Sequence, residues 1–94
     1  MRPPLYLVIQ DGVDRLEDAK DIQEFLRTKG IRAEVEPSER GRTYQVRDVS
    51  RPFRYTRSSE AIDYQKSIEG LGAKYKATGK RYDFRGTFFH KVEK

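Results

Sequence analysis

Residues 5–10, LYLVIQ, form a short run of β-branched, aromatic and aliphatic residues, with prolines before it and an Asp-Gly pair after it. This composition between turn-forming residues is typical of a β-strand. Side chains alternate between the two faces of a strand. We assign to the core the face with Leu5, Leu7 and Ile9, and the opposite face then carries Tyr6, Val8 and Gln10.

A helix is predicted to follow this strand. Asp14, with Glu17 three residues later, resembles a capping box, in which two side chains satisfy free backbone donors at the start of a helix. Apolar residues then recur at helical spacing as far as Gly30, which can adopt the left-handed conformation that ends many helices. This apolar stripe consists of Leu16, Ala19, Ile22, Phe25 and Leu26.

The middle of the chain predicts two further strands. Residues 31–36 alternate between apolar and charged side chains, as a half-buried strand does, and 37–41 are expected to form a turn. Residues 43–49, TYQVRDV, form the third strand, and 50–57 are expected to form a loop. In the third strand Tyr44 and Val46 would face one side, and Gln45 and Arg47 the other.

A second helix and a last strand complete the predicted order. Ser58 or Ser59 can cap the helix, whose stripe is Ala61, Tyr64, Ile68, Leu71 and Tyr75. Gly70 and Gly72 weaken its end. Residues 82–92 could supply a last strand, which Gly86 could interrupt.

The resulting order is strand, helix, strand, strand, helix, strand. A shift of 42 residues superimposes Ala19 on Ala61 and Gly30 on Gly72, which indicates two similar halves. We therefore predict an α+β fold of the ferredoxin-like split βαβ type (βαββαβ), with one antiparallel sheet and two helices on one face. The length of 94 residues suits a single domain, and the other face of the sheet would be open to solvent.

The charge is divided unevenly along the chain. Residues 1–39 hold six Lys or Arg and nine Asp or Glu, a balance of −3, whereas residues 40–94 hold fourteen and six, a balance of +8. The basic character behind the net charge of +5 therefore belongs to the second half. A basic surface attracts polyanions. Cysteine is absent, which excludes disulfides and thiolate metal sites. No apolar run is long enough to span a membrane, so we expect no membrane insertion by these residues.

No pattern in the sequence indicates catalysis. His90 is the single histidine and has no metal ligand at motif spacing. The acidic residues from Asp11 to Asp21 flank the start of the first helix, where negative charge interacts favourably with the positive end of the helix dipole. This structural role is sufficient to explain them. Glycine spacing fits no phosphate-binding loop. We therefore expect no enzyme activity, no cofactor and no metal.

Two segments of the chain resemble a known family. LYLVIQDGV followed by RLEDAKDIQEFLRTKGIRAEVE, and TYQVRDVSRPF followed by SSEAIDYQKSIEGLG, are similar to the SPOR (sporulation-related repeat) domain. The resemblance covers about residues 5–75. The family has Gly before the Pro-Phe pair and a shorter loop after it, whereas here 48–51 and 54–57 lengthen that region, and 79–94 form a longer tail or last strand.

The resemblance implies binding of bacterial peptidoglycan, specifically glycan strands stripped of peptide, through the open sheet face. The chain would then be part of a larger anchored protein of the periplasm or cell envelope. If the resemblance does not hold, we expect a cytoplasmic protein. The implied groove residues are Gln10, Gln45 and Arg47, with Arg51, Phe53, Arg54 and Tyr55 at the rim. Alternatively, Phe53 closes the edge of the core and the arginines are solvated.

Two other functions start from the same surface. RNA-recognition modules stack bases on a sheet of this kind. The arginine and aromatic residues here would allow the basic sheet face to bind RNA or single-stranded nucleic acid. Against this, TYQVRDV lacks adjacent outward aromatics, and Asp48 lies within the strand. The third function is protein interaction or assembly through an edge strand. The sequence does not define the oligomeric state, and we expect a monomer.

Overall fold

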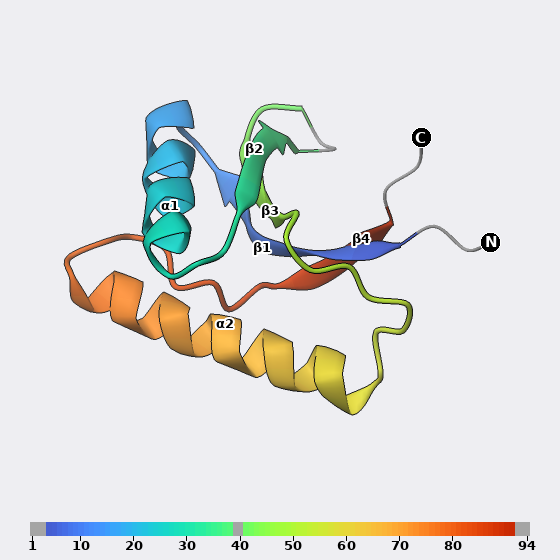
Figure 1. The fold of residues 1–94 in the computed structure, drawn as a ribbon. Coiled ribbons are helices and arrows are strands. Elements are labelled where there is room, and N and C mark those ends of the chain that lie inside the picture. Colours follow the sequence, from blue (N-terminus) through green and yellow to red (C-terminus); the bar gives the residue numbers. More distant parts are fainter. Residues whose placement is uncertain (1–3, 39–40, 92–94) are drawn as a thin grey trace.

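The computed structural model describes residues 4–38 and 41–91 of the chain. Residues 39–40 of the predicted turn and Val92 of the last predicted strand lie outside this part. The elements follow in the order predicted from the sequence (Figure 1). They are β1 (Leu5–Val13), α1 (Leu16–Thr28), β2 (Ala33–Pro37), β3 (Tyr44–Asp48), α2 (Ser59–Ala77) and β4 (Phe88–Lys91).

The four strands form one sheet in the order β2-β3-β1-β4. Each neighbouring pair is antiparallel. The connection through α1 places β2 one strand away from β1, and β3 fills the position between them. The prediction of an α+β fold is confirmed, and the arrangement is compatible with a ferredoxin-like split βαβ topology.

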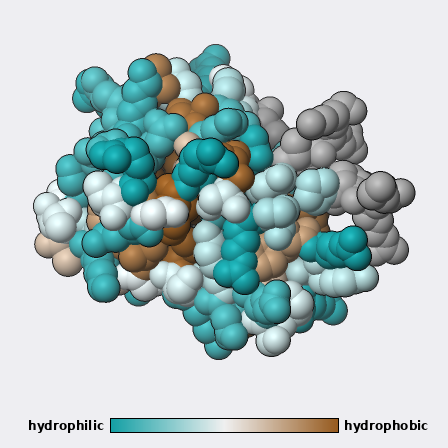
Figure 2. All heavy atoms as spheres, viewed as in Figure 1, coloured by the Kyte–Doolittle hydropathy of each residue, from teal (hydrophilic) through white to brown (hydrophobic). Residues whose placement is uncertain are grey.

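Both helices pack on the same face of the sheet. Their buried residues belong to one hydrophobic cluster with residues of β1 and β3, and Phe25 of α1 lies 4.9 Å from the ring of Tyr75 of α2. The predicted alternation is confirmed at Leu7, Ile9 and Val46, which are fully buried in this cluster. Figure 2 shows a largely hydrophilic surface with hydrophobic residues gathered near the middle of the view.

The helix starts agree only in part with the sequence. α2 is capped as predicted, because Ser58 Oγ accepts a hydrogen bond of 3.2 Å from the Ala61 amide. The predicted capping box at Asp14 is wrong. α1 begins after Arg15, with no side-chain cap, and the Asp14 carboxylate lies 3.3 Å from the guanidinium of Arg81. The carboxylate that was expected to cap α1 therefore pairs with Arg81, which is distant in the sequence.

The segment between α2 and β4 inserts into the core and does not extend the last strand. β4 begins only at Phe88, after Gly86. Phe84 is fully buried, has a φ of 58°, and stacks on Tyr75 with the ring centroids 5.3 Å apart. A left-handed backbone is unfavourable for a bulky residue, so burial of this ring must offset its cost.

Gly72 allows this segment to cross α2 closely. The sequence predicts that Gly70 and Gly72 weaken the end of this helix, but α2 continues through both glycines to Ala77. A Cβ atom added at Gly72 would lie 1.8 Å from the backbone oxygen of Asp83, whereas one added at Gly70 would meet nothing within 4 Å. Gly72 is thus required by packing, and Gly70 is not.

The two glycines give a matched test of this crossing. Gly72→Ala should lower the free energy of unfolding by roughly 1–3 kcal/mol or more, because the segment carrying Phe84 must move away. Gly70→Ala should leave stability unchanged or raise it by up to about 1 kcal/mol, since alanine is the better helix former. Urea unfolding of both variants measures the difference, and equal effects would contradict the close crossing.

Candidate functional site

The sheet face opposite the helices carries a mixed group of aromatic, charged and amide side chains. Cross-strand pairing aligns Glu34 with Arg47 and Glu36 with Gln45, and it aligns Val8 with both Arg47 and Phe88. Tyr6 pairs with His90 at the other edge. We call this surface the open face, and it consists of Tyr6, Val8, Glu34, Glu36, Gln45, Arg47, Phe88 and His90.

Glu36 is the centre of a hydrogen-bond network on the open face. Its Oε1 accepts from Gln45 Nε2 at 2.7 Å and from Arg47 Nε at 2.9 Å. Arg47 also lies 3.5 Å from a carboxylate oxygen of Glu34. The prediction that Gln45 and Arg47 point to this side of the sheet is confirmed. Both side chains are largely buried where they meet Glu36.

The network changes the expected charge of this surface. Burial raises the pKa of Glu36, but the hydrogen bonds from Arg47 and Gln45 and the charge of Arg47 outweigh it, so the pKa lies below its ordinary value. The Glu36 carboxylate is thereby held in its charged form beside Arg47. The glutamates of β2 that lie beside Arg47 thus offset part of the positive charge predicted for this face.

Aromatic side chains give the open face an apolar platform. The guanidinium of Arg47 lies 5.4 Å from the centroid of the Tyr6 ring, and Val8 beneath is completely buried. Phe88 is 39% exposed. Flat apolar surface beside carboxylate oxygens and amide groups can contact the faces of sugar rings and hydrogen-bond their hydroxyls. The alternation of side chains along β2 and β4 could have identified Glu34, Glu36 and Phe88 as residues of this face once the strand order was known.

Gln10 does not join the open face as predicted. The pairing of β1 with β3 shifts register between Val8 and Gln10, and such bulges re-aim side chains. Gln10 Oε1 accepts from the amide of Phe84 at 3.2 Å, and its Nε2 donates to the carbonyl of Asp11 at 2.7 Å. Its side chain therefore holds the segment that enters the core.

The predicted rim residues lie elsewhere. Phe53 is 7% exposed and forms an isolated bridge with Leu5, each amide donating to the other's carbonyl. Its ring lies 5.5 Å from that of Tyr64 on α2, so Phe53 closes the edge of the core. Arg51 stacks 5.0 Å from the centroids of both rings. Arg54 and Tyr55 are exposed and follow Phe53 in the sequence. They belong to the connection between β3 and α2, which runs along one side of the molecule in Figure 1.

Asp48 is a fully buried carboxylate with a structural role. It accepts hydrogen bonds from the Tyr64 hydroxyl and from the amide and hydroxyl of Ser50. Burial, followed by the bond to Asp48, raises the pKa of Tyr64. These contacts fix the end of β3 to α2. The alternation that places Tyr44 and Val46 in the core predicts the same side for Asp48, although its polar partners come from tertiary packing.

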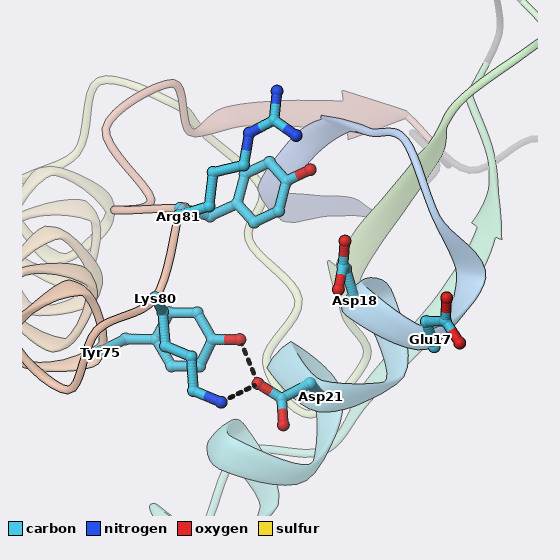
Figure 3. A pocket seen from close by; sticks show the side chains of 7 residues that line it. Glu17, Asp18, Asp21, Tyr75, Lys80 and Arg81 are labelled. Atoms are coloured by element: carbon cyan, nitrogen blue, oxygen red, sulfur yellow. Dashed lines mark hydrogen bonds and ion pairs between the residues drawn. The ribbon is translucent and has the colours of Figure 1, made fainter.

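A pocket of about 310 Å³ lies between α1 and the segment after α2 (Figure 3). Asp21 Oδ2 accepts from the Tyr75 hydroxyl at 2.5 Å and pairs with Lys80 Nζ at 3.1 Å. The Tyr75 bond, helped by Lys80 against the effect of burial, holds the pKa of Asp21 below its ordinary value. These bonds link the two segments and account for the polar lining, which comprises Glu17, Asp18, Asp21, Tyr75, Lys80, Arg81 and Tyr82.

Within residues 4–38 and 41–91, no group of three His, Asp or Glu side chains is arranged to hold a metal ion. His90 lies on the open face, paired across the strands with Tyr6. None of the helices in this part of the chain is long and apolar enough to cross a membrane.

No protein-family model, curated protein or solved structure significantly matches the chain. The resemblance to the SPOR domain therefore stays a prediction from the residues themselves.

The network around Glu36 predicts a pH-dependent contribution to stability. Because its pKa is lowered on folding, this contribution is present above the ordinary value of 4.5 and is lost as the pH falls through the lower folded value. Glu36→Gln should be less stable than the parent by up to about 1 kcal/mol at pH 7, and the difference should shrink toward pH 3. Urea unfolding across this range measures it.

Glu69→Gln provides the control, because Glu69 is exposed, lies in the middle of α2 and makes no ion pair with the described residues. This variant should follow the parent at each pH. If the difference in the free energy of unfolding between Glu36→Gln and the parent does not change with pH, the charge of the Glu36 carboxylate does not stabilise the network.

Proposed function

We propose that the protein is a non-catalytic binding module for glycan strands of the bacterial cell wall, and that it binds them through the open face. The observation that carries this proposal is the position of Tyr6, Phe88 and the Glu36 network on the sheet face opposite the two helices. A linear polysaccharide presents sugar faces and hydroxyl groups in alternation, and such a surface offers a partner for each.

The side chains differ in the part they can play. Phe88 and Glu34 are exposed enough to contact a ligand directly, since 39% of Phe88 and 63% of the Glu34 side chain are accessible. The Arg47 side chain is only 12% exposed. In this proposal Arg47 and Gln45 mainly position Glu36 and the Tyr6 ring.

The charge of the open face favours a glycan over a nucleic acid on this surface. The carboxylates of Glu34 and Glu36, which lie beside Arg47, would repel a phosphate backbone. A glycan strand without peptides has a much lower charge density than a nucleic acid. The same proposal implies a place in the cell envelope, with the chain forming part of a larger anchored protein.

Retention on purified peptide-free glycan strands tests the proposal. Phe88→Ala should weaken binding roughly fivefold or more, because an aromatic contact with the sugar is lost. Ile62→Ala is the matched control, since Ile62 is apolar, 41% exposed and lies on α2 away from the sheet. This variant should bind as the parent does.

Thermal unfolding of both variants confirms that they fold. Failure of the parent chain to be retained would contradict glycan binding. Retention that is insensitive to Phe88→Ala, or that falls equally in Ile62→Ala, would contradict the open face as its site.

A further inference from the structure

Arginines without carboxylate partners gather in the loop that leads into α2. Ion pairs hold five arginines elsewhere among the described residues, namely Arg15, Arg27, Arg47, Arg81 and Arg85. Arg51, Arg54 and Arg57 make no such pair within the described part of the chain, and the same holds for the isolated Arg32 and Arg42. We call residues 51–57 the arginine loop, and it contains no acidic residue.

The arginine loop combines fixed and free guanidinium groups. Arg51 is held against the rings of Phe53 and Tyr64, each 5.0 Å away, so its position is set before any ligand arrives. Arg54 and Arg57 are exposed. A stacked arginine keeps its edge N–H groups available, and guanidinium edges match the oxygens of phosphate.

Tyr55 lies between these arginines and is 62% exposed, the highest value among the large hydrophobic side chains of the described residues. Its carbonyl accepts a hydrogen bond of 3.4 Å from Ser58 Oγ, and Ser58 caps α2. The backbone on which the ring is mounted is thereby tied to the helix. An exposed ring flanked by cations is the arrangement on which nucleic-acid bases stack.

We propose that the arginine loop binds single-stranded nucleic acid, with the guanidinium groups on phosphates and Tyr55 against a base. The residues of the arginine loop are not those of the open face, and the inference does not depend on glycan binding. A membrane surface is a poorer match, because several apolar side chains must enter the headgroup region and the loop offers one exposed ring. Glu60 and Asp63 follow in α2 and offset part of the charge, so binding should be modest and strongest at low salt.

Fluorescence anisotropy with a labelled oligothymidylate tests the proposal over a range of salt concentrations. The double variant Arg54→Ala/Arg57→Ala should flatten the slope of log K against log salt by roughly 1.4, since each single-strand phosphate contact contributes about 0.7. Tyr55→Ala should weaken binding roughly fivefold or more through the lost stacking.

Arg15→Ala/Arg27→Ala is the matched control, because it removes the same charge from arginines that are exposed and ion-paired on or beside α1. This variant and Phe88→Ala should bind the oligonucleotide nearly as the parent does. The proposal is overturned by equal losses in the two arginine variants, or by unchanged binding in Tyr55→Ala, which would indicate a general polyanion site. It is also overturned if anionic phospholipid vesicles are bound and the oligonucleotide is not.

Discussion

The arrangement depends on the sheet being covered on one face only. Leu7 and Ile9 of β1 and Val46 of β3 are completely buried against the two helices. Because side chains alternate along a strand, burial of this set commits Tyr6, Val8 and Arg47 to the opposite side. The polar side chains there satisfy one another through Glu36, so they remain in place without a covering helix. One-sided burial therefore creates the surface to which we assign the function.

The segment between α2 and β4 secures the helices on the covered face. Phe84 enters the core in a left-handed conformation, and Gly72 provides the space in which the backbone passes α2. Tyr75 stacks on Phe84 and donates its hydroxyl to Asp21 of α1, which joins both helices to this segment. The pocket of Figure 3 lies at the same junction and is explained by these contacts. Its polar residues thus contribute to architecture.

Periodicity predicted the elements because local spacing reflects which face of each element is buried. The same reasoning failed where distant residues decide the outcome. Asp14 pairs with Arg81 and does not cap α1, and the shifted register of β1 turns Gln10 toward Phe84. The 42-residue shift equated Gly30 with Gly72, yet Gly30 has a φ of 79° after α1 whereas Gly72 lies within α2. The partners of Arg47 became evident only when pairing aligned β2 beside β3.

The structure divides the aromatic and arginine residues of the central segment between two surfaces of different charge. Arg47 belongs to the open face and is neutralised by glutamates, whereas Arg51 lies beside α2 with other unpaired arginines. An NMR titration of the isotope-labelled chain with peptide-free glycan strands tests this division most directly. We predict amide shifts at Tyr6, Glu36, Arg47 and Phe88, with residues 51–57 and both helices unaffected. Shifts confined to residues 51–57 or to α2 would contradict the assignment of the uncovered sheet as the glycan-binding surface.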